Sequence, residues 1–268
     1  MKKLLVLLAL LLGGTTVLAR NAEEILLYHF DSTRISPVDA GEPRLSEVDH
    51  NGIILWVAPP QADKPTILYF HGNAGNLATR TGRFSQFLDR GYGVVAMAYP
   101  GSSGSTGEQS ADWFQRVAAG IYLDLPTLTG TGPVILYGES LGTGVAVGVA
   151  ASAVADTAKG IGPPAAMVLE APFTSIRAMA RALYPQLGDL TDRLPNLYDN
   201  KHWIALRDTP LLILHGSEDR LIPVEMGQQL FALSPAADKQ IHIVPGAGHT
   251  DVWQADAQTV LYRFLDRF

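Results

Sequence analysis

The sequence predicts an α/β fold, with a mostly parallel sheet covered by helices on both faces. Short apolar runs alternate with helix-type segments along the chain. Several of these runs are apolar at every position, which is typical of strands buried on both faces. The chain has 268 residues, of which 47% are hydrophobic and 17% charged. That length and composition are sufficient for one large domain with a sizeable core.

The elements follow one another in a regular order. We expect strands at residues 53–58, 66–70, 93–99, 133–137, 165–170, 210–216 and 240–244. We expect helices at residues 80–90, 108–128, 141–155, 224–233 and 252–268. The first helix is amphipathic, with Phe84, Phe87 and Leu88 on one face, and Gly91 ends it. Proline and glycine mark the turns between elements, as in the 59–65 turn.

One interval, residues 171–208, leaves room for a short cap over the domain. Part of it must be the helix that follows the strand at 165–170. Apolar and aromatic residues are clustered there: Leu183, Tyr184, Leu187, Leu190, Leu194, Leu197, Tyr198 and Trp203. They form either a small satellite core under a loop or an apolar wall over the active site. If they form a wall, Leu183, Tyr184 and Trp203 are the side chains expected to limit the pocket.

Residues 138–142 read Gly138-Glu139-Ser140-Leu141-Gly142, which is G-x-S-x-G. The pattern lies between an apolar strand and a small-residue helix, the setting of a nucleophile elbow. A nucleophilic serine needs a sharp, strained turn to expose its Oγ, and glycines on either side avoid collisions between the strand and the helix. The pattern therefore predicts that Ser140 is a catalytic nucleophile.

An acid and a histidine follow in sequence, each after its own strand. Asp219 lies on the loop after the strand at 210–216, and His249 on the loop after the strand at 240–244. The carboxyl ends of parallel strands meet at one edge of the sheet, where catalytic groups collect. We expect Ser140, Asp219 and His249 to form a triad there. Glu170, at the end of another strand, is an alternative acid.

A glycine-rich loop, residues 71–76, follows the strand at 66–70. Such a loop allows a backbone N–H group to turn toward a developing oxyanion. We assign the oxyanion hole to the N–H groups of Asn73 and Leu141, the second being the residue after the nucleophile.

With these residues in place, the chain resembles the α/β-hydrolases, and within them small, nearly lid-less serine hydrolases. The shared signatures are HGNAGN at 71–76, GESLG at 138–142, PFTS at 172–175, HGxxD at 215–219 and GAGH at 246–249. The resemblance covers residues 25–268 and implies an α/β-hydrolase fold with the order Ser, Asp, His in the chain. It also implies that His71 and His215 shape loops. The chain departs from the pattern at residues 99–107, where a basic side chain found in similar proteins is missing.

The resemblance implies a serine hydrolase that cleaves short- to medium-chain carboxylic esters through an acyl-enzyme. Two alternatives keep the chemistry and change the substrate. One is an acyl thioesterase or depalmitoylase, and the other is an amide hydrolase of the serine aminopeptidase type. A remote alternative is an inactive hydrolase fold that serves as a binding protein.

Composition excludes several other classes. The net charge of −6 and the lack of a basic patch argue against a nucleic-acid partner. The chain has no cysteine, so disulfides, cysteine nucleophiles and thiolate metal sites are excluded. We find no metal-binding spacing and expect no metal and no cofactor, only a small-molecule ester, thioester or amide substrate. The sequence leaves the oligomeric state open.

The N-terminus has the pattern of a bacterial secretory signal. A basic pair, Lys2-Lys3, precedes an apolar run from Leu4 to Leu12, and small residues lead to Ala19. We expect residues 1–19 to be a signal peptide cleaved after Ala19, or else a retained N-terminal anchor, and residues 20–268 to be a single domain. The protein would be exported to the periplasm, or anchored in the inner membrane facing it. Contact with a membrane is expected only through that anchor.

Overall fold

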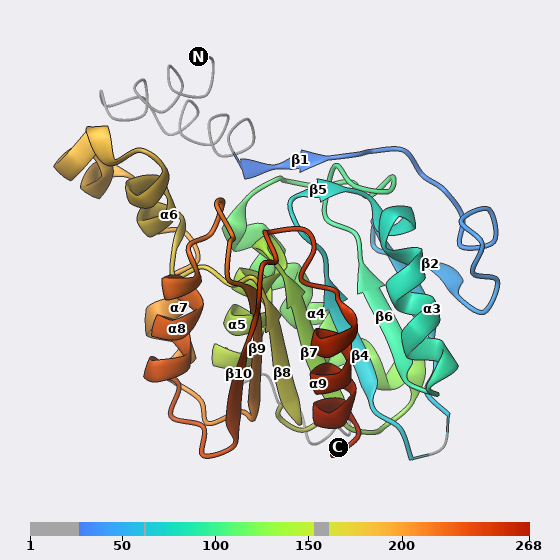
Figure 1. Ribbon diagram of the computed structural model, residues 1–268. Coiled ribbons are helices and arrows are strands. Elements are labelled where there is room, and N and C mark those ends of the chain that lie inside the picture. Colours follow the sequence, from blue (N-terminus) through green and yellow to red (C-terminus); the bar gives the residue numbers. More distant parts are fainter. Residues whose placement is uncertain (1–26, 62, 153–160) are drawn as a thin grey trace.

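The computed structural model describes residues 27–61, 63–152 and 161–268, which fold around one central sheet (Figure 1). The sheet has eight strands in the order β10-β9-β8-β7-β4-β6-β3-β2. Their bounds are β2 Ser46–His50, β3 Ile53–Ala58, β4 Thr66–Phe70, β6 Gly93–Met97, β7 Val134–Glu139, β8 Ala166–Glu170, β9 Leu211–Gly216 and β10 Lys239–Val244. Two-residue strands β1, His29–Phe30, and β5, Ala74–Gly75, form a separate parallel pair.

The six strands from β10 to β6 are parallel to one another. At one edge, β3 pairs antiparallel with β6, and β2 pairs antiparallel with β3. Every residue of β4, β6, β8 and β9 is buried, as the uninterrupted apolar runs predicted. Strand β2 was not predicted. It pairs with β3 through a tight turn in which Asn51 and Gly52 both have positive φ, at 56° and 86°.

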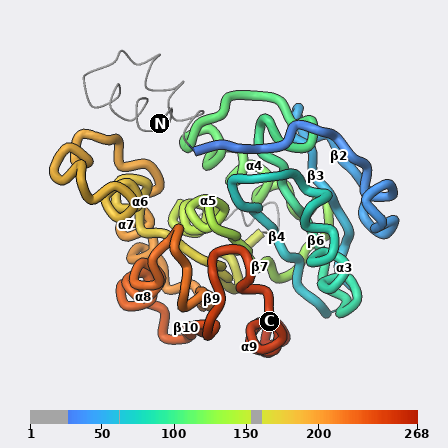
Figure 2. Tube along the Cα trace, turned by 45° about the horizontal axis from the view of Figure 1, so that its top comes forward, coloured from blue at the N-terminus to red at the C-terminus, as the bar shows by residue number. Residues whose placement is uncertain are grey.

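Helices cover both faces of the sheet, and each face has its own core (Figure 2). Helices α3, Thr81–Asp89, and α9, Ala255–Leu265, pack on one face with Phe84, Phe87 and Leu261 buried. Helices α4, Ala111–Thr129, α5, Leu141–Ala151, and α8, Val224–Leu233, pack on the other. The predicted α/β fold with a mostly parallel sheet is confirmed.

Helix ends account for most differences from the predicted bounds. Helix α4 begins at Ala111 rather than at residue 108, because the Ser110 hydroxyl accepts a hydrogen bond from the Trp113 N–H and caps the helix. Helix α9 begins at Ala255 rather than at residue 252. Helix α5 ends at Ala151, and the predicted continuation into residues 153–155 lies outside the described residues.

The interval predicted as a cap contains helices α6, Ile176–Leu183, and α7, Asn200–Ile204, with the 3₁₀ segment η3, Pro185–Arg193, between them. We call residues 176–204 the cap segment. In Figure 1 α6 and the segment that follows it project from the body of the domain. Ala180, Leu187 and Leu194 form a small cluster with Tyr184 against it. This cluster is the small satellite core that was one of the two alternatives from the sequence. Tyr198 and Trp203, by contrast, belong to the main core.

The expected signal peptide or anchor, residues 1–19, lies outside the described residues. Within the part of the chain that the structure describes, no helix is both long and apolar enough to cross a membrane.

Candidate active site

Ser140 lies in a strained turn between β7 and α5. Its φ of 51° with ψ of −112° is an unfavourable backbone conformation for a side chain with a Cβ atom. The flanking glycines explain how the turn is accommodated. A Cβ on Gly142 would lie 2.0 Å from the Phe70 carbonyl oxygen, and one on Gly138 would lie 2.5 Å from the Thr143 Cα. The sequence therefore needs glycine at both positions, so that β7 and α5 can approach the end of β4.

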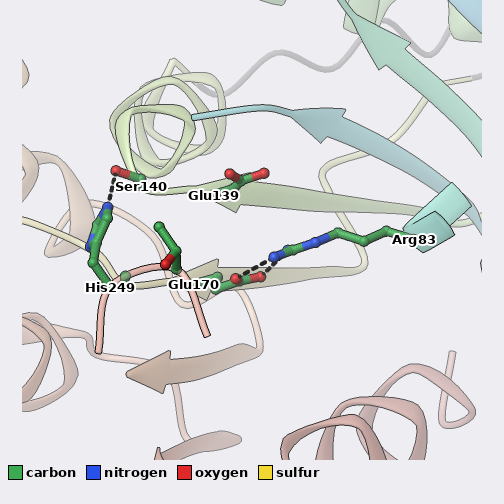
Figure 3. A pocket seen from close by; sticks show the side chains of 7 residues that line it. Arg83, Glu139, Ser140, Glu170 and His249 are labelled. Atoms are coloured by element: carbon green, nitrogen blue, oxygen red, sulfur yellow. Dashed lines mark hydrogen bonds and ion pairs between the residues drawn. The ribbon is translucent and has the colours of Figure 1, made fainter. Parts of the chain in front are cut away.

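Ser140, His249 and Asp219 come together at the carboxyl edge of the sheet. The Ser140 Oγ lies 2.9 Å from the His249 Nε2, a contact drawn as a dashed line in Figure 3. The His249 Nδ1 lies 2.8 Å from the Asp219 Oδ2. Because a carboxylate only accepts, Nδ1 carries the proton, which leaves Nε2 to accept from the serine hydroxyl. The loops after β7, β9 and β10 supply one residue each, as predicted.

Asp219 is held in an ionised, oriented state by several donors. The backbone N–H groups of Leu221 and Ile222 donate to its Oδ1 at 2.9 and 2.8 Å. His215, fully buried, places its Nε2 3.4 Å from the Oδ2. Burial alone raises the pKa of Asp219, but the hydrogen bonds from His215, His249 and Ile222 outweigh it and hold the pKa below its usual range. The Asp219 carboxylate is thus charged at neutral pH.

The glycine-rich loop (residues 71–76) orients the N–H group of Asn73. The His71 Nδ1 donates to the Gly72 carbonyl at 2.7 Å. Since the C=O and N–H of a trans peptide point in opposite directions, this bond turns the Asn73 N–H away from the His71 ring. Burial, with the nearby charge of Arg80, lowers the pKa of His71 to about 3, so the ring is neutral and shapes the loop.

The second expected oxyanion donor, Leu141, is the first residue of α5. The first N–H groups of a helix have no acceptor within the helix, and the helix dipole adds partial positive charge there. The Ser140 N–H is already used, because it donates to the Glu170 carbonyl at 2.8 Å. Leu141 thus offers a backbone donor in the residue that directly follows Ser140.

A cavity of about 70 Å³ lies beside Ser140 and His249. Its other lining residues are Arg83, Glu139, Glu170, Ala171 and Thr250. The expectation that Leu183, Tyr184 and Trp203 limit the pocket is wrong for this cavity, because none of them lines it. Leu183 is 37% exposed and Tyr184 packs on the satellite core instead. Arg83, Glu139 and Glu170 contribute charged groups to its walls.

Glu170, the alternative acid, is engaged elsewhere. Figure 3 shows its carboxylate turned toward Arg83, which contacts both of its oxygens at 2.5 and 2.9 Å. The Tyr137 hydroxyl donates to it as well, at 2.6 Å. The structure gives His249 a carboxylate partner in Asp219, not in Glu170.

A second ion pair beside the cavity was missed by sequence reasoning. Arg80 contacts both carboxylate oxygens of Glu139, and the Tyr69 hydroxyl donates to the same carboxylate at 2.6 Å. Burial raises the pKa of Glu139, but the charges of Arg80 and Arg83 outweigh it and lower the pKa to about 2. The only signal in the sequence was the position of Glu139 directly before the nucleophile.

This arrangement has the parts of a nucleophilic hydrolytic site. A hydroxyl lies against an imidazole, the imidazole is oriented by a buried carboxylate, and backbone donors lie nearby. Within residues 27–61, 63–152 and 161–268, no group of three or more His, Cys, Asp or Glu side chains could hold a metal ion.

Comparisons with known proteins show that the chain is similar to hydrolases. A model described as "Alpha/beta hydrolase family" matches residues 67–261. An uncharacterized protein of Mycobacterium tuberculosis is 32% identical over 202 residues, covering 74% of this chain and 67% of that protein. The lysophosphatidylserine lipase ABHD12 of Rattus norvegicus is 30% identical over 242 residues, covering 80% of this chain and 59% of that protein. This chain therefore spans well under two thirds of that lipase.

Solved structures share the fold at low sequence identity. The esterase Pf2001 of Pyrococcus furiosus superposes with a TM-score of 0.64 at 18% identity, covering 89% of this chain and 99% of that chain. A monoacylglycerol lipase of Paleococcus ferrophilus has a TM-score of 0.60 at 18% identity, covering 84% and 99%.

Proposed function

The chain belongs to the alpha/beta hydrolase family, and on that premise we propose that it is a serine hydrolase of short- to medium-chain carboxylic esters. One observation carries the proposal. A continuous hydrogen-bonded chain runs from the Ser140 Oγ through His249 to Asp219, with distances of 2.9 and 2.8 Å. Such a chain activates a hydroxyl that is otherwise a weak nucleophile at neutral pH.

The proposed mechanism has two half-reactions. His249 Nε2 accepts the proton of Ser140 as the Oγ attacks the acyl carbonyl, and then gives it to the leaving alcohol. Asp219 keeps the imidazole in the required tautomer and stabilises the imidazolium. The N–H groups of Asn73 and Leu141 stabilise the tetrahedral oxyanion. Water, activated by the same histidine, then hydrolyses the acyl-enzyme and releases the acid.

The ester substrate is favoured by two independent observations. Relatives and structural neighbours are named as a lysophosphatidylserine lipase, an esterase and a monoacylglycerol lipase, all of which cleave acyl esters. The cavity beside Ser140 has a volume of only about 70 Å³, which favours a short acyl chain over a long one. Thioester and amide substrates use the same chemistry, so the experiment below tests them as well.

We also propose that residues 20–268 form one hydrolase domain and that residues 1–19 direct export to the periplasm, by a cleaved signal or as an anchor. The support is the basic pair, apolar run and small residues at the N-terminus. N-terminal sequencing of the protein expressed in a Gram-negative host tests this. A mature chain that begins at Arg20 supports cleavage, and a retained Met1 in washed membranes supports the anchor.

A substrate panel tests the function. We would compare p-nitrophenyl esters from acetyl to palmitoyl, the matching thioesters and a set of aminoacyl anilides. We expect kcat/KM to be highest for acetyl to hexanoyl esters, and Ser140→Ala to abolish the activity. Ser152→Ala, at the other end of α5, is the matched control and should leave the activity unchanged, because the Ser152 hydroxyl donates to the Val149 carbonyl and not to a residue of the site.

Three results would contradict the proposal. Activity that rises continuously through palmitoyl chains would favour a lipase or depalmitoylase. A strong preference for anilides would favour an amide hydrolase. No turnover of any substrate by the folded wild-type protein would favour a binding protein.

A further inference from the structure

We propose that Arg80 is a positioning residue, whose ion pair with Glu139 holds the glycine-rich loop (residues 71–76) in register with the nucleophile elbow. The inference rests on the proposed function and adds a residue to it. The two expected oxyanion donors belong to different segments: Asn73 lies in the loop after β4, and Leu141 is the first residue of α5, after β7. Something must fix the distance between them, because oxyanion stabilisation depends on donors placed to within a fraction of an ångström.

Arg80 is bonded both to the end of β7 and to the glycine-rich loop. Its Nη2 and Nε contact the two carboxylate oxygens of Glu139 at 2.9 and 3.2 Å, so the pair is bidentate. Its Nη1 donates to the Ala74 carbonyl at 2.6 Å. Glu139 directly precedes Ser140, and Ala74 directly follows Asn73. A single guanidinium group thus joins the neighbours of the nucleophile and of the proposed oxyanion donor.

The loop is folded closely around this guanidinium. A Cβ on Gly72 would lie 2.9 Å from the Glu139 Oε1, and one on Gly75 would lie 2.8 Å from the Arg80 Nη1. These glycines lie on either side of Asn73 in the chain, and Gly75 has a φ of 76°. The contact of the loop with the ion pair is therefore direct, with no room for side chains between them.

The chemistry of the pair requires arginine. Both side chains are largely buried, with exposed fractions of 11% for Arg80 and 17% for Glu139. A bidentate, buried pair uses the planar fork of a guanidinium, which the single ammonium of lysine cannot reproduce. Arg80→Lys keeps the charge and removes the second contact to Glu139 or the contact to the loop. The loop can then shift relative to Ser140 while the rest of the fold remains.

The test is the kinetics of Arg80→Lys, measured per active site. We expect kcat/KM for an acetyl ester to fall about 10- to 100-fold, less than or equal to the loss of one oxyanion donor. The inhibition constant of a trifluoromethyl ketone should rise by the same factor, because its adduct resembles the tetrahedral intermediate. The pH at which activity is half-maximal should not move, because the contacts of His249 are unchanged. If Arg80 had only a structural role, Arg80→Lys would lower stability and leave kcat/KM and the inhibition constant unchanged.

Arg44→Lys is the matched control. Arg44 also makes a bidentate pair, with Glu42. It contacts Asp89 and the Ser85 carbonyl of helix α3, the helix that begins directly after Arg80. It contacts none of the segments after β4, β7, β9 and β10 that form the site, so the kinetics of Arg44→Lys should equal those of the wild type. Glu139→Gln is a second variant of similar shape. The double variant Arg80→Lys/Glu139→Gln should lose no more kcat/KM than the more affected single variant. Both substitutions remove the same Arg80–Glu139 interaction, so their effects should not add.

The outcomes separate the two proposals. If Arg80→Lys and Glu139→Gln both have wild-type kcat/KM and ketone affinity, the positioning role is wrong. If the losses of the two variants add in full, the pair does not act as a unit and the proposal is also overturned. If Ser140→Ala remains active, the proposed function itself fails, whatever the arginine variants do.

Discussion

The catalytic edge of the sheet and the cap segment differ in how firmly each is held. At the edge, the loops after β4, β7, β9 and β10 are joined by hydrogen bonds between residues far apart in sequence. Examples are the bonds from Ser140 to Glu170 and from His249 to Asp219. Residues 176–194 of the cap segment have a separate apolar core of three buried side chains with Tyr184 against it, and Leu183 and Leu190 are exposed. Helix α7, at the end of the segment, packs on the main core through Ile204.

Under the proposed function, the firmly held sheet edge carries the chemistry and the cap segment is the part that can vary. A triad requires fixed geometry, and it lies where strand ends converge and glycines allow close approach. A short, loosely packed insert can change without disturbing that geometry, and this is how one fold serves many substrates. Four experiments test the contrast, from the largest expected effect to the smallest.

Asp219→Asn should have the largest effect on catalysis. An asparagine in place of the carboxylate favours the wrong imidazole tautomer, and kcat should fall on the order of 10⁴-fold. Asp192→Asn, on the exposed cap segment, should leave kcat unchanged. Steady-state kinetics on an acetyl ester measure both. A greater loss in Glu170→Gln than in Asp219→Asn would move the acid to Glu170.

Glycine-to-alanine variants compare the packing of the two regions. Gly142→Ala puts a methyl group against the Phe70 carbonyl and should cost at least about 3 kcal/mol of stability. Gly188→Ala in the cap segment meets no atom within 4 Å, but its φ is 49°. It should cost less, about 1 to 3 kcal/mol, through backbone strain at its ψ of −131°. Denaturant unfolding gives both values, and equal costs would remove the contrast.

The pH dependence of stability tests the buried state of His71. Burial lowers its folded pKa to about 3, against about 6.5 in an unfolded chain. The unfolded chain therefore takes up a proton below pH 6.5 that the folded protein does not, and stability is lost as pH falls toward 3. One such group costs about 1.4 kcal/mol per pH unit.

The comparison is between wild type and His71→Gln, unfolded in guanidinium chloride at pH 7, 6 and 5. The carboxylate of Glu139, with its pKa lowered from 4.5 to about 2, adds acid sensitivity only below about pH 4.5. Between pH 7 and pH 5, His71→Gln should lose less free energy of unfolding per pH unit than the wild type. The same slope in both proteins would show that His71 takes up its proton in the folded state.

The double variant Leu183→Ser/Leu190→Ser should have the smallest effect on stability and activity. Both side chains are exposed, at 37% and 40%, and neither lines the cavity beside Ser140. The double variant should stay within about 0.5 kcal/mol of wild-type stability and keep the same kcat/KM for acetyl and hexanoyl esters. A large loss of activity on hexanoyl esters would mean that the cap segment contacts the acyl chain after all.

The sequence predicted the sheet well where strands are buried on both faces. Strands β4, β8 and β9 were found within one residue, because uninterrupted apolar runs flanked by glycine or proline have few other interpretations. Strand β2 was missed because four of the five residues of Ser46–His50 are polar, although Asn51-Gly52 is a strong hairpin signal. The cap segment could not be predicted, because a short apolar cluster does not indicate which surface it packs on.

The site divides in a similar way. The positions of Ser140, Asp219 and His249 at one sheet edge followed from motifs after strands, since local patterns and topology suffice for that. The ion pairs of Arg80 and Arg83 did not, because each joins residues at least 59 positions apart. Such contacts depend on tertiary packing, and a charged residue on a predicted amphipathic helix is normally a solvated one.

The nucleophile is the central claim, and an active-site probe tests it most directly. The folded protein would be treated with a fluorophosphonate, digested and mapped by mass spectrometry, beside Ser140→Ala with its fold checked by circular dichroism. We expect one adduct, on Ser140, and no labelling of the variant. An adduct on another serine, or labelling that persists in Ser140→Ala, would contradict the account.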